Sequence, residues 1–253
     1  MARATAPLFS NPMPARTTAI PQLNSAQRLR ALYETLAAAY GPQHWWPSQS
    51  PLETIVGACL TQGTAWTAVE RSLSNLRQRN LLRFDALRAL PIAELRSLIR
   101  PSGFMQRKAA TLHALLDLIH HEYGGSIERF ARVPLPTARA QLLAISGIGP
   151  ETADAILLYA LNQPAMVVDE YLRRVALRHG LAPAHAGYAT LQQLALSAFA
   201  DEQNPAALAD HCNEFHALIV QIGKDHCRRT PDCAHCPLRA DLDTHLHGRP
   251  VSC

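Results

Sequence analysis

The spacing of apolar residues limits the fold more than any other feature of the chain. Leu29, Leu32 and Leu36 recur at helical spacing, and the same period of about 3.6 residues continues from Leu52 to Leu60. No stretch alternates with period two for long enough to predict a strand, and no internal repeat is evident. Aromatic residues make up only 6% of the chain while Ala and Leu abound, which favours helices. The sequence therefore predicts an all-α fold.

Breaks in the apolar pattern delimit the expected helices. Residues 1–22 contain four prolines with scattered Ser and Thr, so we expect a disordered tail there and an ordered chain from about Ser25. From residue 223 onward the chain shows little helical pattern. Helices are predicted over 25–41, from 51 up to TQGT at 61–64 and again beyond it, and over 84–90, 92–99, 104–123, 137–145, 170–179, 189–200 and 205–222.

Length and charge set the broad class of protein. A chain of 253 residues can form one large domain or two modest lobes. The N-terminal segment has no unbroken apolar core and no apolar run could cross a bilayer, which predicts a cytoplasmic, nucleoid-associated protein without membrane contact. The net charge of +4 is compatible with a polyanionic partner but does not require one.

The segment SGIGPET predicts a tight turn that opens a helix. Gly147 and Gly149 flank Ile148, and Pro150 stands where a first helical residue belongs. Free amides at such a turn can bind an anion, and nucleic-acid phosphate is the commonest large anion in a cell. The same glycines would also suit a plain turn between two packed helices, so they leave both interpretations open. Asp169 follows twenty residues after Gly149.

Three of the six cysteines crowd together near the C-terminus, at Cys227, Cys233 and Cys236. In a cytoplasmic protein this spacing indicates a metal site rather than disulfides.

The order of these motifs resembles the endonuclease III branch of the helix-hairpin-helix DNA glycosylases, a base-excision repair superfamily. The resemblance covers about residues 25–240 and is carried by ACLTQGTAW, SGIGPETADAILLYAL, VVDEYLRR and HALIVQIGKDHC. It implies two helical lobes with a DNA-binding cleft between them, one formed by residues 51–164 and the other by 23–50 together with 165–253.

One position within the resemblance decides the type of reaction. Glu151 stands where the strand-cleaving members of the family carry the lysine that forms a Schiff base, a step that needs an amine. The chain has only two lysines, Lys108 and Lys224. The resemblance therefore implies a monofunctional glycosylase that uses water as its nucleophile. Asp169 would stabilise the oxocarbenium-like sugar and orient or deprotonate that water, and it could equally cap the following helix.

The aromatic segments HWWP and TQGTAW look like those of the 3-methyladenine-specific members. On this resemblance Trp45, Trp46, Pro47 and Trp66 form an aromatic base pocket, with Glu151 near its mouth. A methylated purine is cationic and electron-poor, so it stacks well on indole rings. The alternative is that these large residues only pack the core.

The resemblance also implies contacts to double-stranded DNA that contains damaged bases. Gln62 matches a position that fills the gap left by a flipped base, although it could instead be a surface or helix-capping amide. The amides of Gly147, Ile148 and Gly149 would hold a phosphate, with Lys108 and other basic side chains nearby. We expect the protein to act as a monomer.

Members of this branch commonly end in four cysteines that hold a [4Fe–4S] cluster, and Cys227, Cys233 and Cys236 look like the first three. The fourth ligand departs from the pattern, because Asp243 lies near the expected position and Cys253 is the only later cysteine. Four outcomes stay open: a cluster closed by Cys253, a cluster closed by Asp243, a zinc site completed by His245, His247 or Cys212, or no metal.

Two further functions compete with the one implied above. A glycosylase and lyase for oxidised pyrimidines could use an amine that the sequence does not reveal. A helix-hairpin-helix protein could also bind DNA without any catalysis.

Overall fold

The structure is a computed structural model that describes residues 23–43, 45–46 and 48–245. Every regular element in these ranges is helical, which confirms the predicted all-α fold. Residues 1–22, Pro47, His247 and Cys253, about which the sequence made predictions, lie outside the described ranges. The elements are α1 (Ser25–Tyr40), α2 (Pro51–Thr61), α3 (Trp66–Gln78), α4 (Phe84–Ala89), α5 (Ile92–Leu98), η1 (Arg100–Ser102), α6 (Met105–Tyr123), α7 (Ile127–Ala131), α8 (Leu135–Leu143), α9 (Pro150–Ala155), η2 (Ile156–Ala160), α10 (Glu170–Arg178), α11 (Tyr188–Ser197), α12 (Pro205–Asp225) and α13 (Arg239–His245).

Local capping explains why the main helices begin where the sequence predicted. The Asn24 side chain accepts a hydrogen bond from Gln27 N, and the Gln27 side chain accepts one from Asn24 N, which fixes the start of α1. At the start of α2 the Ser50 hydroxyl accepts a hydrogen bond from Glu53 N, and Pro51 stands at the first helical position. The short helices α7 and α13 were not predicted.

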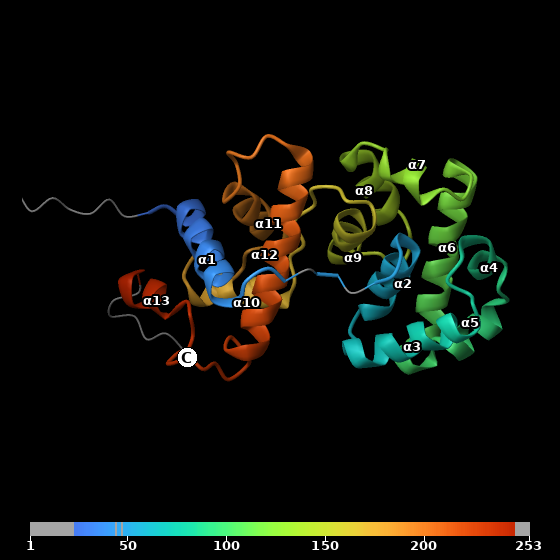
Figure 1. The fold of residues 1–253 in the computed structure, drawn as a ribbon, viewed down its shortest axis with the longest axis horizontal. Coiled ribbons are helices and arrows are strands. Elements are labelled where there is room, and N and C mark those ends of the chain that lie inside the picture. Colours follow the sequence, from blue (N-terminus) through green and yellow to red (C-terminus); the bar gives the residue numbers. More distant parts are fainter. Residues whose placement is uncertain (1–22, 44, 47, 246–253) are drawn as a thin grey trace, which may run out of the picture.

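The helices form two groups (Figure 1). Helix α1 joins the C-terminal helices: it packs on α11 and α12, and α10 packs on α12. The other group contains α2 to α9, with α2 against α3, α6 and α9. This arrangement agrees with two helical lobes, while the lobe boundaries taken from the resemblance stay a prediction.

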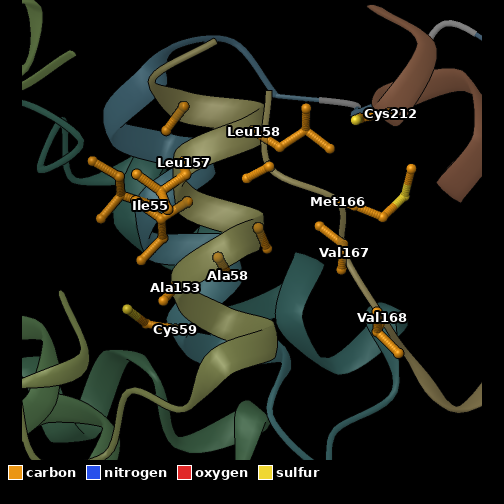
Figure 2. Close-up of a cluster of buried hydrophobic side chains, with 14 of the residues drawn as sticks. Ile55, Ala58, Cys59, Ala153, Leu157, Leu158, Met166, Val167, Val168 and Cys212 are labelled. Carbon is orange, nitrogen blue, oxygen red and sulfur yellow. The ribbon is translucent and has the colours of Figure 1, made fainter. Parts of the chain in front are cut away.

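The π-helical turn η2 connects the two groups. It extends α9 and packs against both α2 and α12. Figure 2 shows Ile55 of α2 beside Leu157 of η2 and Cys59 of α2 beside Ala153 of α9, with Met166 and Val168 along the extended segment that leads to α10. All of these side chains are buried. A continuous apolar core therefore supports the start of α10, where Asp169 lies. No helix in the described ranges is long and apolar enough to span a bilayer.

Candidate active site

Asp169 lies at the junction between the extended segment and α10. One carboxylate oxygen, Oδ1, accepts a hydrogen bond from Leu172 N at 2.8 Å, so Asp169 caps the helix as the sequence allowed. Its other oxygen, Oδ2, lies 3.6 Å from Nε2 of His216, and the side chain is 12% exposed. Capping uses only one oxygen, which leaves the second available at the site.

A buried carboxylate, Asp154 of α9, supports this junction. It is completely buried and pairs with Arg139 of α8 at 2.7 and 3.1 Å. It also accepts hydrogen bonds from Tyr188 Oη and from Gln192 Nε2, both at 2.7 Å, and the Gln192 amide in turn donates to the carbonyl of Met166 at 2.7 Å. Asp154 was not predicted from the sequence, although a carboxylate inside the apolar run TADAILL was a visible signal.

A cavity of about 530 Å³ opens beside Asp169. The residues that the sequence analysis assigned to the pocket and that the structure describes all line it: Trp45, Trp46, Trp66 and Glu151, together with Asp169 and Gln62. The volume lies in the range typical of small-ligand sites. Segments far apart in the sequence therefore meet around one space.

The tryptophans pack on one another while they line the cavity. The ring centroid of Trp46 lies 5.2 Å from that of Trp66, edge to face, and 5.0 Å from that of Tyr159. A β-carbon added at Gly57 of α2 would lie 3.4 Å from Trp46 Cζ2 and 3.6 Å from Trp66 Cη2. The absence of a side chain at Gly57 lets both rings settle on α2, so packing and lining are compatible roles.

Glu151 lies in the first turn of α9, where it lines the cavity and is exposed. Desolvation by the cavity walls raises the pKa of its carboxyl, and the nearby negative charge of Asp169 raises it further. Three carboxylates (Glu151, Asp169 and Glu170) and one ammonium (Lys224) line the cavity, which gives it a net negative charge.

Lys224 of α12 is the amine whose location the sequence did not reveal. Its Nζ lies 5.2 Å from the centroid of the Trp45 ring and lines the same cavity as Asp169. The sequence predicted this helix only as far as residue 222 and placed Lys224 nowhere, whereas α12 continues to Asp225. An amine is thus present at the site, although not at the position of Glu151.

The hairpin has the expected turn, but its two glycines serve different purposes. Gly147 has φ +94°, and a β-carbon there would collide with Thr111 Oγ1. Gly149 has an ordinary φ of −94° and open space around it. The amide of Ile148 donates to the carbonyl of Ile145 at 3.0 Å. Within the described ranges, this leaves the amides of Gly147 and Gly149, but not that of Ile148, without an internal acceptor.

Gln62 ties the loop after α2 to the hairpin. Its Nε2 donates to the carbonyl of Gly147 at 2.8 Å and to Thr152 Oγ1 at 2.9 Å. The side chain that the resemblance assigns to filling a gap in DNA is therefore anchored beside the hairpin, at the edge of the cavity.

The expected DNA contact of Lys108 is not supported by its position. The residue is 4% exposed, and its ammonium donates to Leu60 O at 2.8 Å, Thr64 Oγ1 at 2.6 Å and Ser102 O at 2.9 Å. Burial lowers its pKa by desolvation. Three internal acceptors use its three donors, so Lys108 closes the turn between α2 and α3.

Phe104 is an exposed aromatic residue that the sequence analysis did not single out. It is 67% exposed and adopts a left-handed conformation with φ +45° before α6. With exposed Arg107 it borders a recess of about 140 Å³ whose other lining residues are Gln62, Lys108, Thr111 and Gly147. An apolar residue directly after the break PSG was the available signal.

The cysteine-rich tail brings its three predicted cysteine ligands to one place, but not in an arrangement that would hold a metal ion. Cys227, Cys233 and Cys236 line one small cavity, and Arg178 donates to Cys227 Sγ at 3.2 Å. Cys233 is disulfide-bonded, and exposed Asp243 pairs with Arg239 instead of facing the thiols. Across the described ranges no group of three or more His, Cys, Asp or Glu side chains is arranged to hold a metal ion. These residues as they stand do not fit a cluster.

Comparisons with known proteins agree with this geometry. A protein of Methanocaldococcus jannaschii that is provisionally named a DNA repair glycosylase is 37% identical over 218 residues, which cover 85% of this chain and 96% of the relative. The solved 3-methyladenine DNA glycosylase of H. pylori, bound to 1,N6-ethenoadenine, is 33% identical with a TM-score of 0.66, and the match covers 80% of this chain and 98% of that one. A trapped endonuclease III–DNA covalent intermediate shares the fold, with a TM-score of 0.70 at 22% identity over 86% of this chain and 94% of the other.

The sequence profile of the HhH-GPD superfamily base excision DNA repair proteins matches residues 56–200, from α2 through the hairpin and Asp169 to the end of α11. The chain therefore belongs to the HhH-GPD superfamily and is an endonuclease III-like DNA glycosylase of base excision repair.

Proposed function

We propose that this protein is a monofunctional glycosylase that removes alkylated purines, chiefly 3-methyladenine, from double-stranded DNA. The observation that carries the proposal is that three tryptophans line the same cavity as Asp169. A methylated purine is cationic, so it is attracted both to indole faces and to a cavity with net negative charge. The solved relative that is 33% identical is a 3-methyladenine glycosylase, which supports this substrate class.

The proposed reaction follows from the carboxylates at the site. The damaged nucleotide flips into the cavity, and the bond between the sugar C1′ and the base nitrogen breaks with its electron pair leaving on the base. Asp169 stabilises the oxocarbenium-like sugar and accepts a proton from the water whose oxygen bonds to C1′. The cationic base departs as a neutral molecule, so no general acid is needed. Glu151, which replaces the Schiff-base lysine, supplies charge at the opening.

DNA would bind across the face that carries the hairpin and the recess beside it. The amides of Gly147 and Gly149 offer donors to a phosphate, and exposed Arg107 adds positive charge. Exposed Phe104 has the size and polarity of a side chain that enters a base stack. We propose that one copy of the chain suffices for this contact and that it acts in the nucleoid.

Release of free bases from methylated duplex DNA, resolved by chromatography, tests the proposed function. Wild-type protein should release 3-methyladenine, and Asp169→Asn should not. If Asp169→Asn released it as fast as wild type, Asp169 would not be the catalytic group. If wild type released no base, a protein that binds DNA without catalysis would be favoured.

Lys224 supports a second candidate, a glycosylase and lyase that uses this amine for a Schiff base. Borohydride reduction on a duplex that contains an abasic site separates the two. A covalent protein–DNA adduct that is lost in Lys224→Gln but kept in Lys108→Gln would establish the lyase. We expect no adduct.

The [4Fe–4S] cluster also stays a proposal. It would require Cys233 as a thiolate in place of the disulfide, with Cys227, Cys236 and Cys253 as the other ligands, and its role would be to fold the tail. Bound iron and sulfide in anaerobically purified protein, both lost in Cys227→Ser, would support the cluster. Protein without iron that retains a disulfide under the same conditions would reject it.

A further inference from the structure

His216 of α12 is a buried histidine that lines the cavity and has no part in the reaction proposed above. The residue is 7% exposed and lines the cavity, with Nε2 lying 3.6 Å from Oδ2 of Asp169. This nitrogen is buried and has no hydrogen-bond partner within the described ranges. A buried polar atom without a partner is costly, which points to a partner that comes into range at the site.

Tyr159 of η2 sets the hydrogen position on the imidazole. Its hydroxyl is hydrogen-bonded to Nδ1 of His216. Burial raises the pKa of Tyr159 well above its usual value, and the negative charge of Asp169 adds to this, so the hydroxyl keeps its proton. That proton needs an acceptor, and Nδ1 is the one within reach. A neutral imidazole that accepts at Nδ1 carries its own hydrogen on Nε2.

The opposite tautomer is disfavoured by the same contacts. It would direct the lone pair of Nε2 at the carboxylate of Asp169 and leave the hydroxyl proton of Tyr159 without the acceptor it has now. The other charged side chains around the cavity are Glu151, Glu170 and Lys224, and none of them has a hydrogen bond to His216 within the described part of the chain.

We propose that His216 is a positioning residue for Asp169: Tyr159 fixes the imidazole so that Nε2–H holds Oδ2, while Leu172 N–H holds Oδ1. Together the two donors fix the plane of the carboxylate toward the sugar. The distance of 3.6 Å between Nε2 of His216 and Oδ2 of Asp169 shortens to that of a hydrogen bond when the flipped nucleotide excludes water from the cavity. The inference rests on the proposed function.

Paired variants separate positioning from packing. In His216→Gln the amide nitrogen reaches the place of Nε2, whereas in His216→Asn it reaches only the place of Nδ1. We expect His216→Asn to slow single-turnover release of 3-methyladenine about 10- to 100-fold with little change in duplex binding, and His216→Gln to recover most of the rate. His121→Asn, on the exposed face of α6, is the matched control. Equal losses in Asn and Gln, or no loss in Asn, would overturn the proposal.

A measurement without DNA keeps this test independent of the substrate. In protein with ¹⁵N-labelled histidine, NMR should show His216 with a hydrogen on Nε2 and none on Nδ1, and Asp169→Asn should shift the Nε2 signal. A hydrogen on Nδ1 alone, or an Nε2 signal that is unchanged in Asp169→Asn, would refute the pairing of His216 with Asp169. If wild type releases no methylated base, the proposed function fails, while the NMR result still decides how His216 and Asp169 are paired.

Discussion

The hydroxyl of Thr111 lies so close to the α-carbon of Gly147 that no β-carbon fits between them. The same hydroxyl donates to the carbonyl of Ser146 at 2.9 Å, so α6 is bound directly to the hairpin. Gly147→Ala should therefore destabilise the protein by about 1–3 kcal/mol, from the positive φ and the collision together. Thermal unfolding measures the loss.

Gly149→Ala is the matched control, because Gly149 has an ordinary φ and open space around it. Its stability should stay within about 0.5 kcal/mol of wild type. Adding Thr111→Ala to Gly147→Ala should recover the part of the loss that comes from the collision. If the two glycine variants were equally stable, the steric argument would fail.

Lys108 and Arg107 are neighbours in α6 with opposite expected roles. Lys108→Met removes the ammonium that donates to the carbonyls of Leu60 and Ser102, of which the second keeps the Thr64 hydroxyl as a donor. The loss should cost about 1–3 kcal/mol in the free energy of unfolding. Arg107→Ala should leave stability unchanged and weaken duplex binding, with a smaller dependence of affinity on salt. Chemical denaturation and binding titrations at several salt concentrations check both. The reverse result would restore Lys108 as a DNA contact.

The contrast between these two residues shows what the sequence could and could not reveal. Helical periodicity located most of the long helices, because apolar spacing reports directly on which face is buried. The approach of Trp45, Trp66 and Asp169 to one cavity followed from the resemblance rather than from spacing. The burial of Lys108 and the position of Lys224 at the cavity depend on how the helices pack against one another. Neither could be predicted from the sequence, because a lysine has the same local pattern whether it is buried, at a cavity or exposed.

Asp154 holds α8, α9 and α11 together and, through Gln192, supports the segment before Asp169. Asp154→Asn removes a buried charge but leaves Arg139 without its partner, so we expect a loss of about 3–5 kcal/mol in the free energy of unfolding. Gln192→Ala keeps the ion pair and should lose less stability, yet it should slow base release because Met166 loses its donor. Denaturation and single-turnover assays on both variants test this. Base release unaffected by Gln192→Ala would show that the segment before Asp169 does not need this support.

The two roles of the tryptophans can be separated by comparing excision with binding. Trp66→Ala removes one wall of the cavity and the edge contact with Trp46. If the rings hold the flipped base, Trp46→Ala and Trp66→Ala should weaken release of 3-methyladenine by at least about 10-fold more than they weaken binding to undamaged duplex. Both quantities can be measured on the same preparations. Equal losses would assign the rings to packing alone.

Asp241 of α13 docks the tail on α1 and on the C-terminal end of α10, and its ionisation should make that docking depend on pH. Arg28 donates to its two oxygens at 3.0 and 2.7 Å, and His179 Nδ1 lies 2.7 Å from Oδ2. Burial alone would raise the pKa of Asp241, but the hydrogen bonds from His179 and Arg28 lower it from 3.8 to about 2.

A lowered folded-state pKa contributes stability that is complete above the unfolded pKa and is lost as the pH falls through the folded pKa. Wild type should therefore exceed Asp241→Asn by about 2 kcal/mol near neutral pH. The difference should shrink between about pH 4 and pH 2, as denaturant titrations across that window would show. A difference that stayed constant down to the lower pH would mean that shape, rather than charge, holds α13 against α1 and α10.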